Sequence, residues 1–381
     1  MKIAVVIPKY GLVGGAESFA FELTERLAAR SGFEIHVFAN RWRRGNSSIT
    51  FHRVPILRFP RLLRQISFAY FANKRIHLKE YNLVHSHDRI FRMDLFTMHG
   101  IPHKTWVKET RHKPLSLFDR SMAWVEKKAL KEPYIPMILP VSSLVKDELL
   151  RLYNIPESKI RVIHPGVSKD RFSAINQQAC REEVRRDYGL SQNDIVVLFV
   201  GMNFEIKRLE LVLKGVADLV SRETKDSKLK LLVVGKGNKE RYLTMAHELG
   251  IANRVIFAGV TREAEKYYLA SDIFAMPSKF DTFGIAVLEA MMAGLPVIIT
   301  RTVGAKDLID SGVHGFILAE RPSASDFSEN LAFLMKKENR IKMGQNGRLV
   351  ALQCTWDKIV DKVIGLYRQL NTLGMHNGKS S

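Results

Sequence analysis

The sequence predicts an α/β protein with two domains. Its 381 residues are enough for two domains that each bury a core of their own. Short apolar runs that suit buried parallel strands alternate along the chain with segments of helical periodicity. A polar stretch, residues 168–193, separates two such series. We therefore expect one layered α/β domain on each side of that stretch.

The first series predicts six strands and three helices. The strands are expected at Ile3–Ile7, Glu34–Phe38, Asn82–His85, Asp94–Met98, Ile138–Val141 and Ile160–Ile163. The helices are expected from the loop at residues 9–17 to about Arg30, from Leu62 to about Lys79, and from Ser143 to Leu152, with a serine cap at its start.

The second series predicts the same alternation. Strands are expected at Ile195–Val200, Leu229–Val234, Val255–Phe257, Ile273–Met276 and Leu295–Ile299, with a turn and strand at Gly312–Leu318. Helices are expected at Leu209–Val220, Lys239–Leu249, Gly284–Met292 and Trp356–Leu370.

Cysteine content and hydropathy indicate a cytosolic protein. The two cysteines, Cys180 and Cys354, are far apart and have no CxxC spacing. This argues against a disulfide framework or a cysteine zinc site. No apolar run approaches the ~18–20 residues of a membrane span. The apolar run near the N-terminus is too short for a signal peptide, and we interpret it as the first strand.

The net charge of +20 requires an anionic partner: nucleic acid, anionic lipid or a phosphorylated substrate. Between Arg41 and Lys79 there are ten Lys or Arg residues, no Asp or Glu, and interleaved aromatic residues. That pattern suits contact with anionic lipid headgroups, and a solvated basic face is the alternative. Nucleic acid is not expected, because the sequence has no helix-turn-helix, zinc-finger or RNP1 signature.

A candidate anion site lies within Asp272–Thr300. A loop with Asp281, Thr282, Phe283 and Gly284 links a strand to the start of a helix, where backbone N–H groups and the helix dipole favour an anion. Glu289 follows eight positions after Asp281. The N–H groups could bind a diphosphate, and the neighbouring carboxylates could bind hydroxyls. This combination suits a sugar nucleotide. An ordinary βαβ unit with solvated acids is the alternative.

Two other motifs are weaker. Gly14 and Gly15 precede a helix and allow close approach of a ligand, but the dinucleotide pattern GxGxxG is not satisfied, and a plain turn is the alternative. His85 and His87 invite a metal hypothesis, but no third ligand cluster is evident. The chain has no Asp-x-Asp motif either, so metal-dependent chemistry that uses this motif is not supported.

The stretch from Asp281 to Val297 resembles the E-x7-E signature of family 4 glycosyltransferases. Phe283-Gly284 lies inside the spacing, and Glu289 opens the run EAMMAGLPV. One departure is the first acid, which is Asp281 rather than Glu and is one methylene shorter. The resemblance implies the GT-B fold, two Rossmann-like doubly wound parallel-sheet domains that face a deep interdomain cleft. It also implies transfer with retention of anomeric configuration.

The same resemblance places the domains. The turn His164-Pro165-Gly166-Val167 resembles the segment that ends the first domain of the family. We therefore expect an acceptor-binding domain at residues 1–167, joined by a C-terminal helix at 356–381 that crosses back onto it. The nucleotide-sugar-binding domain is expected at residues 168–355.

Roles of individual residues follow from the resemblance alone. His99, Lys207 and Asp281 would be catalytic, with His99 facing the donor sugar, Lys207 at the leaving diphosphate and Asp281 at the sugar. Lys207 matches the lysine of the family's glycine-rich element, although Met202 replaces the usual Arg and Arg208 replaces the usual Gly. The donor-binding residues would be Gly14, Gly15, Arg208, Thr261, Thr282, Phe283, Gly284, Ile285 and Glu289, with Glu289 on the ribose.

The N-terminal half has a Lys9-Tyr10…Gly14-Gly15 opening, the basic aromatic stretch and a general spacing through Val167. In these features it resembles bacterial lipopolysaccharide-core glucosyltransferases. This implies a metal-independent hexosyltransferase without a cofactor, whose co-substrate is a nucleoside diphosphate sugar such as UDP-glucose. The acceptor would be an anionic glycolipid with phosphorylated heptose. The protein would be cytoplasmic and would contact the anionic inner-membrane leaflet through residues 41–79. One alternative is a glycosyltransferase whose acceptor is a phospholipid or an exopolysaccharide intermediate. The other is a non-catalytic basic module that binds membrane or nucleic acid.

Overall fold

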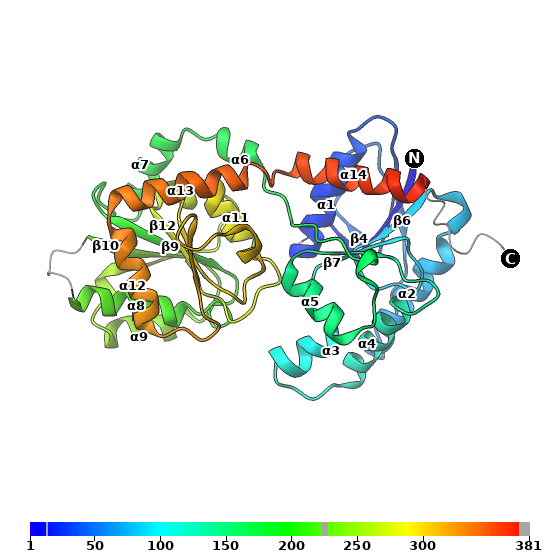
Figure 1. Cartoon of the computed structure of the whole chain (residues 1–381), viewed down its shortest axis with the longest axis horizontal. Helices are drawn as coiled ribbons and strands as arrows, with labels where there is room; N and C mark the ends of the chain where they lie inside the picture. Colours follow the sequence, from blue (N-terminus) through cyan, green and yellow to red (C-terminus); the bar gives the residue numbers. More distant parts are fainter. Residues whose placement is uncertain (13, 223–227, 373–381) are drawn as a thin grey trace. The chain divides into compact units, whose positions relative to one another are not determined.

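The protein consists of two compact units (Figure 1). The computed structural model describes residues 1–12, 14–222 and 228–372. The N-terminal unit comprises Met1–Gly166 and Trp356–Ser381, and the C-terminal unit comprises Val167–Thr355. Val167, which we expected to end the first unit, belongs to the second, because its N–H donates to the Cys354 carbonyl and it forms a bridge with Thr355.

The N-terminal unit is built on a parallel sheet with the strand order β5-β3-β1-β6-β7-β8. The strands are β1 (Lys2–Val6), β3 (Glu34–Ala39), β5 (Thr50–Arg53), β6 (Leu83–Ser86), β7 (Leu95–Met98) and β8 (Met137–Pro140). Val5 in β1 lies between Val37 of β3 and His85 of β6. A separate two-stranded sheet pairs β2 (Lys9–Tyr10) with β4 (Arg41–Trp42).

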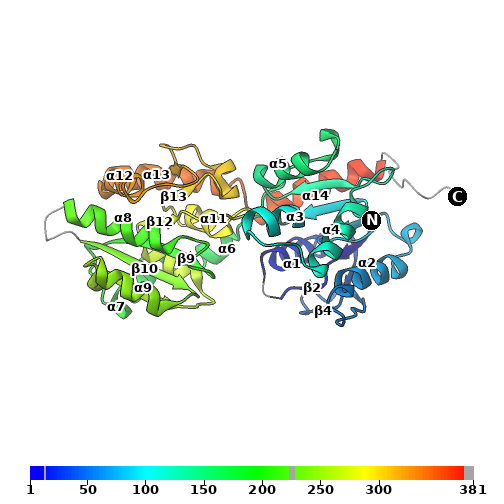
Figure 2. The same ribbon diagram turned by 90° about the horizontal axis from the view of Figure 1, so that it is seen from below.

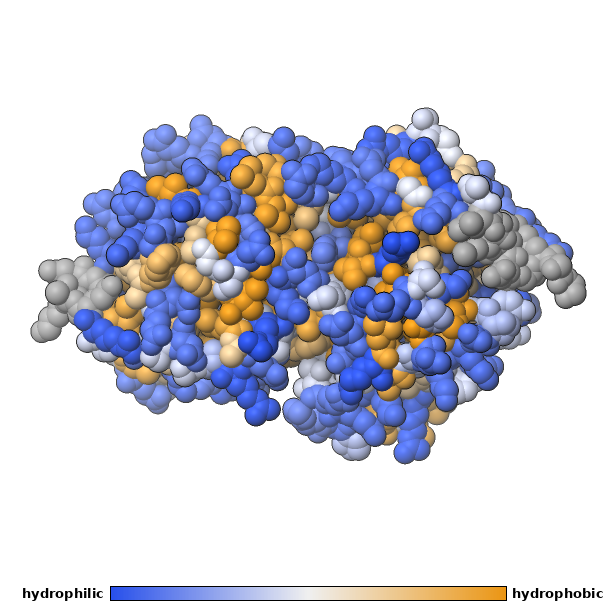
Figure 3. All heavy atoms as spheres, in the orientation of Figure 1, coloured by the Kyte–Doolittle hydropathy of each residue, from blue (hydrophilic) through white to orange (hydrophobic). Residues whose placement is uncertain are grey.

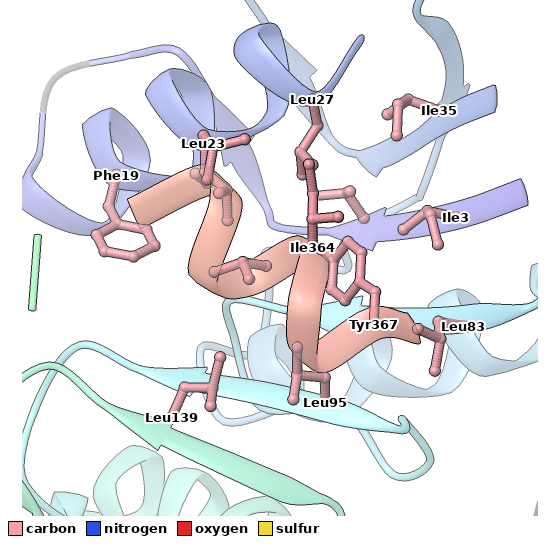
Figure 4. Close-up of a cluster of buried hydrophobic side chains, with 14 of the residues drawn as sticks. Ile3, Phe19, Leu23, Leu27, Ile35, Leu83, Leu95, Leu139, Ile364 and Tyr367 are labelled. Carbon is pink, nitrogen blue, oxygen red and sulfur yellow. The ribbon is translucent and has the colours of Figure 1, made fainter. Parts of the chain in front are cut away.

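Helices α1 (Gly15–Ala28) and α14 (Trp356–Thr372) pack against each other and against this sheet (Figure 4). Phe19, Leu23 and Leu27 of α1 meet Ile364 and Tyr367 of α14 in one buried cluster. The expected return of the C-terminal helix to the first domain is therefore present over residues 356–372, and the rest of the expected segment, 373–381, lies outside the described residues. The other helices of the unit are α2 (Leu63–Arg75), α3 (His103–Thr105), a π-helix at Trp106–Thr110, α4 (Leu117–Ala129) and α5 (Ser143–Leu152).

The C-terminal unit repeats the same topology with the strand order β11-β10-β9-β12-β13-β14. Its strands are β9 (Ile195–Gly201), β10 (Leu229–Gly235), β11 (Val255–Gly259), β12 (Ile273–Met276), β13 (Val297–Thr300) and β14 (Gly315–Leu318). Its helices include α8 (Leu209–Arg222), α9 (Lys239–Glu248), α11 (Ile285–Met292) and α12 (Ala324–Met335). Side chains of α8, α9 and α12 form one core with the strands. Figure 2 shows the ribbon of these elements from below.

The polar stretch 168–193, to which we had assigned no elements, forms α6 (Lys169–Ser173) and α7 (Gln177–Asp187). Helix α7 packs on α10 (Ala264–Ala270). The fully buried Arg185 holds it in place, because its guanidinium binds the Asp272 carboxylate at 2.7 Å and the Ala270 carbonyl at 3.0 Å. Only Cys180, Val184 and Arg185 of α7 are buried, so most of the helix is solvated and its sequence is polar.

The prediction of a strand at Ile160–Ile163 is wrong. Of these four residues, only Ile160 forms a bridge, with Ile138. The N–H groups of Arg161 and Ile163 donate to the carbonyls of Ile138 and Pro140 at 2.9 Å. Pro140 has no N–H to return the next bond, so the ladder does not continue.

Several helices and strands also begin or end at other residues than predicted. Helix α2 ends at Arg75 instead of Lys79, where a short helix at Leu78–Glu80 follows. Strand β13 starts at Val297, because the Leu295 N–H donates to the Ala290 carbonyl and closes α11. The remaining elements are α13 (Lys337–Ala351) and short helices at Glu157–Lys159, Ala252–Arg254 and Gly304–Leu308.

Hydrophilic side chains cover most of the face of the two units seen in Figure 3, and hydrophobic ones form small patches there. None of the helices that the structure describes combines the length and the apolar character needed to cross a membrane.

Two glycines of α13 provide a test of the packing in the C-terminal unit. A Cβ on Gly344 would lie 1.9 Å from the Gly294 carbonyl oxygen, whereas a Cβ on Gly347 would lie 3.6 Å from its nearest neighbour, Met291. We expect Gly344→Ala to lower the free energy of unfolding by about 1–3 kcal/mol through overpacking. We expect Gly347→Ala to leave it unchanged or raise it by up to about 1 kcal/mol through helix propensity. Urea denaturation measures both, and equal values would contradict this packing.

Candidate active site

The two sheets define where ligands are expected to bind. In each unit, the strand order reverses between its first strand and its fourth: β1 and β6 in one, β9 and β12 in the other. Doubly wound sheets bind ligands beyond the carboxyl ends of the strands at this switch point. In the C-terminal unit, the loops that follow β9 and β12 hold Lys207 and Asp281.

Lys207 and Asp281 form an ion pair at that point. The Lys207 ammonium donates to Asp281 Oδ2, and the two side chains are only 18% and 19% exposed. The other carboxylate oxygen accepts the Phe283 N–H at 3.2 Å. Gly201, at the end of β9, leaves room for this arrangement, since a Cβ there would lie 2.9 Å from Lys207 Cγ. The structure therefore brings together two of the three predicted catalytic side chains.

Helix α11 starts directly beside this pair. Its first residue follows Gly284, whose φ of 85° is a left-handed conformation that side chains rarely adopt. A Cβ at Gly284 would also lie 2.9 Å from Met276 and Val303 side-chain atoms. The Ncap position is this glycine, so it offers no side-chain cap. The first N–H groups of a helix have no partners within it, so this end of α11 can bind an anion next to the Lys207 cation.

Glu289 lies on the same helix and has an unusual environment. The hydroxyl of the buried Tyr268, on α10, donates to Glu289 Oε2 at 2.9 Å. Burial raises the pKa of the Glu289 carboxyl to about 7, and the nearby Glu265 carboxylate acts in the same direction. The Tyr268 hydrogen bond and the Arg171 charge oppose that rise. Tyr268 was not among the predicted residues, because its contact with Glu289 depends on how α10 packs on α11.

The other predicted donor-binding residues divide into two groups. Thr282, Phe283 and Ile285 flank Gly284 at the start of α11, with Phe283 buried and Ile285 39% exposed. Arg208 and Thr261 lie elsewhere on the sheet edge.

Arg208 follows Lys207 but turns away from it. Its backbone has a left-handed φ of 55°, and its guanidinium donates to the Glu320 carbonyl, beyond edge strand β14, at 2.7 Å. Met202, at the position of the family's usual Arg, is 62% exposed. Thr261 follows the opposite edge strand, β11, where its hydroxyl accepts the Glu263 N–H at 2.9 Å.

The N-terminal unit contains a cavity of about 290 Å³ at the carboxyl ends of β1, β6 and β7. Charged and imidazole side chains line much of it: Lys9, Glu17, Arg64, His87, Asp88, Arg89 and His99. Gly14, with a φ of 146°, precedes α1 near this lining, and a Cβ on Gly15 would meet no atom within 4 Å. His99, Gly14 and Gly15 thus belong to the N-terminal unit, whereas the other nine predicted residues belong to the C-terminal unit.

Two of the histidines that line the cavity, His87 and His99, lie close to a third, His85. His85 is fully buried and bonds the Tyr367 hydroxyl through Nδ1 and the Thr97 hydroxyl through Nε2, both at 2.7 Å. His87 Nδ1 lies 3.1 Å from His99 Nε2. Burial lowers the pKa of His85 and of His99 to about 3, so both imidazoles are neutral. Among the described residues, no three His, Cys, Asp or Glu side chains form a group that could hold a metal ion.

A buried ion pair shapes the cavity wall, and no pattern in the sequence signals it. Arg89 Nε donates to Glu126 Oε2 at 2.6 Å. The buried Glu126 carboxylate, on α4, also accepts the Tyr153 hydroxyl at 2.8 Å and the His103 N–H at 3.1 Å. Three separate segments supply these partners, so only the folded chain brings them together.

Comparison with known proteins identifies the class of enzyme. The family described as Glycosyltransferase Family 4 matches residues 13–171, and the family described as Glycosyl transferases group 1 matches residues 180–350. A D-inositol 3-phosphate glycosyltransferase of Corynebacterium jeikeium (strain K411) is 30% identical over 317 residues, which cover 78% of this chain and 74% of that protein. The chain belongs to the family 4 glycosyltransferases, as predicted.

Solved structures confirm the predicted GT-B fold. WaaG, a glycosyltransferase involved in lipopolysaccharide biosynthesis, superposes with a TM-score of 0.79 at 20% identity, over 96% of this chain and 99% of WaaG. The Anabaena protein HepE, solved in complex with UDP-glucose, superposes with a TM-score of 0.73 at 17% identity, over 97% of this chain and all of HepE. At these identities, the likeness shows two Rossmann-like domains and the fold alone.

The raised pKa of Glu289 predicts a pH-dependent stability. The carboxyl has a pKa of about 7 when folded and an ordinary value of 4.5, so the folded state binds the proton more tightly. Its stabilising effect is complete below pH 4.5 and is lost as the pH rises through 7. We expect Glu289→Gln, which stays neutral, to raise the free energy of unfolding at pH 8 by roughly 1–3 kcal/mol relative to the parent.

The difference should vanish near pH 4.5. Urea denaturation at both pH values measures it, with the exposed Glu240→Gln on α9 as the control. A difference that does not change with pH would contradict the raised pKa.

Proposed function

We propose that this glycosyltransferase moves a hexose from a UDP-sugar to a phosphorylated polyol acceptor of the lipopolysaccharide-core type, with retention of anomeric configuration. The observation that carries the proposal is the Lys207–Asp281 pair beside the first turn of α11. A cation and free helix N–H groups at one switch point match a diphosphate, and the adjacent carboxylate matches a sugar hydroxyl.

The chemistry follows from that arrangement. The acceptor oxygen forms a bond to the anomeric carbon while the bond from that carbon to the diphosphate oxygen breaks. Negative charge develops on the leaving diphosphate, where Lys207 and the N–H groups near Gly284 stabilise it. The acceptor proton moves to the leaving phosphate. Preorganised donors of this kind account for much of the rate of many enzymes.

Asp281 and Glu289 have separate tasks in this scheme. Asp281 is partly exposed and pairs with a cation and a backbone N–H, and its carboxylate can also accept hydrogen bonds from the sugar. Glu289 would accept hydrogen bonds from the ribose hydroxyls. A carboxylate is a stronger acceptor than a neutral carboxyl, so these hydroxyls should bind best above the Glu289 pKa of about 7.

The comparisons with known proteins and the net charge of the chain support the choice of substrates. HepE was solved with UDP-glucose, which favours a uridine nucleotide donor. WaaG belongs to lipopolysaccharide biosynthesis, and the Corynebacterium relative is named for D-inositol 3-phosphate. Phosphorylated heptose and inositol phosphate share a ring with hydroxyls and a phosphate, and the net charge of +20 favours such anionic acceptors. Family membership favours an enzyme over a non-catalytic basic module.

Donor binding and turnover test the proposal. We expect UDP and UDP-glucose to raise the melting temperature, and GDP, ADP and GDP-mannose to leave it unchanged. Saturation at ~100 Kd corresponds to about 2.7 kcal/mol. Lys207→Met should lower kcat for UDP release by about 10²–10³-fold, because it removes one stabilising donor from the transition state.

Lys214→Met, on the exposed side of α8, is the matched control and should keep the parent kcat. Radiolabelled UDP-glucose with phosphorylated heptose or D-inositol 3-phosphate as acceptor provides the turnover assay. Near-normal turnover of Lys207→Met would remove Lys207 from the mechanism. No melting shift with any nucleotide would overturn the donor site.

The basic region 41–79 supports contact with an anionic membrane surface. Phe59 is 90% exposed, Leu57 is 49% exposed and Tyr70 is 53% exposed. Arg58 and Arg61 flank Phe59 in the sequence. Exposed apolar side chains among cations suit insertion between charged lipid headgroups.

We expect the protein to sediment with vesicles that contain phosphatidylglycerol and to remain in solution with pure phosphatidylcholine vesicles. Phe59→Ser should weaken the binding several-fold, since it removes buried apolar area, and 0.5 M salt should weaken it further by screening. Phe333→Ser is the control, because Phe333 is an exposed aromatic residue of α12, outside the basic region. Equal binding to both vesicle types would contradict the membrane contact.

A further inference from the structure

Tyr268 carries a hydroxyl into the apolar interior of the C-terminal unit. The residue is fully buried on α10, and its ring lies against Phe172 of α6 and Phe274 of β12, with ring centroids 6.3 and 5.9 Å away. Among the described residues, its hydroxyl makes one hydrogen bond, which it donates to Glu289 Oε2 at 2.9 Å. A phenylalanine would fill the same space without that group, so packing alone does not require a tyrosine here.

The two carboxylate oxygens of Glu289 have different surroundings. Oε2 accepts the hydrogen bond from the buried Tyr268, whereas Oε1 has no hydrogen-bond partner within the described chain. Glu289 as a whole is partly exposed. The buried side-chain atoms of the described chain that lack a partner are Thr24 Oγ1 and His87 Nε2, so Oε1 reaches solvent. One oxygen is therefore fixed inside the protein, and the other stays available to a ligand.

The hydrogen bond from Tyr268 restricts how the Glu289 side chain can turn. A glutamate side chain is flexible and loses rotamer freedom when it binds a ligand. The Tyr268 ring is enclosed between two other aromatic rings, so the position of its hydroxyl is fixed. A carboxylate held by such a donor is preorganised, and a ligand hydroxyl binds to it at a lower entropic cost.

The same hydrogen bond favours the ionised form of Glu289. Burial and the Glu265 carboxylate raise the pKa of this carboxyl, whereas the Tyr268 hydroxyl and the Arg171 charge lower it. Arg171, on α6, and Glu265, on α10, pair with each other at 3.2 Å, and both remain when the Tyr268 hydroxyl is removed. Loss of that hydroxyl therefore raises the pKa of Glu289. Less of the carboxyl is then ionised at a given pH, and the ionised form is the stronger acceptor.

We propose that Tyr268 is a positioning residue of the donor site, which holds the Glu289 carboxylate in place for the ribose hydroxyls of the nucleotide. This inference rests on the proposed function, which assigns the ribose to Glu289. Tyr268 itself touches no substrate in this scheme and acts through Glu289. It thereby contributes to the preference of the donor site for a ribose that carries its hydroxyls.

Two nucleotides and two tyrosine variants test this role. UDP carries both ribose hydroxyls, and 2′,3′-dideoxy-UDP carries neither. We expect the parent protein to bind UDP about 10–100-fold more tightly, because a carboxylate can accept hydrogen bonds from both hydroxyls. Tyr268→Phe should weaken UDP binding by about tenfold and change dideoxy-UDP binding by less than about twofold. Titration calorimetry near pH 8 measures each Kd.

Tyr267→Phe is the matched control, because it makes the same change at the neighbouring position of α10. The Tyr267 hydroxyl shares a hydrogen bond of 2.9 Å with the Tyr188 hydroxyl, and the described structure gives it no bond to Glu289. Both Kd values should stay at the parent level in this variant. Tyr268→Phe keeps the buried ring, and its binding of dideoxy-UDP shows whether the site is still folded.

A merely structural role of Tyr268 gives a different result. Damage to the packing of the site would weaken the binding of both nucleotides equally in Tyr268→Phe, and that outcome would overturn the proposal. An unchanged Kd for UDP in this variant would overturn it as well.

The pH dependence of the two Kd values gives a second readout. Their ratio, dideoxy-UDP over UDP, removes any titration of the diphosphate, which both nucleotides share. In the parent, the ratio should rise as the pH increases through about 7, where Glu289 loses its proton. In Tyr268→Phe, the rise should move to higher pH, because the donor that favours the carboxylate is gone. A rise at the same pH as in the parent would contradict an action of Tyr268 on Glu289.

Failure of this role and failure of the proposed function give different results. If the parent prefers UDP over dideoxy-UDP, the donor site stands, and an equal preference in Tyr268→Phe overturns only the role of Tyr268. If the parent binds no UDP, or binds both nucleotides equally, the proposed assignment of the ribose to Glu289 fails, and Tyr268 loses its role with it.

Discussion

Parallel pairing of the strands is the constraint on which the rest of this structure depends. Parallel neighbours need a crossover between them, so helices cover the sheet and all carboxyl strand ends meet at one edge. In the C-terminal unit, this brings Lys207 and Asp281 into contact although they are 74 positions apart. In the N-terminal unit, it gathers Lys9, His87 and His99 around one cavity.

Burial of ionisable groups gives the two units different chemistry. In the C-terminal unit, Lys207 and Asp281 form an ion pair beside a helix end. In the N-terminal unit, His87 and His99 are bonded to each other instead of to a carboxylate, so burial keeps them neutral. Charge suits a diphosphate, and neutral hydrogen-bonding groups suit hydroxyls. The division into a donor site and an acceptor site that we propose follows this contrast.

Predictions from the sequence failed in two places. In one, a polar residue is buried, and in the other, a residue of the neighbouring strand lacks the N–H that strand pairing needs. Helix α7 is mostly solvated, and the residue that fixes it to the unit is a cation, Arg185, whose guanidinium is enclosed by Asp272 and backbone carbonyls. Ile160–Ile163 is apolar enough for a strand, but Pro140 in the neighbouring strand has no N–H to continue the ladder. In both cases, the deciding partner is remote in the chain or is a single residue of a neighbouring strand.

The sequence alone determined the family, the alternation of strands and helices, and the local geometry of the loop before α11. These depend on short-range features: apolar runs, the spacing from Asp281 to Glu289, and a glycine where the backbone requires a left-handed φ. Only the tertiary structure decided that Arg208 turns toward Glu320, that Tyr268 encloses Glu289, and that His87 Nε2 finds no partner among the described residues. Burial and hydrogen bonding between distant segments set these properties, and no local pattern of residues encodes them.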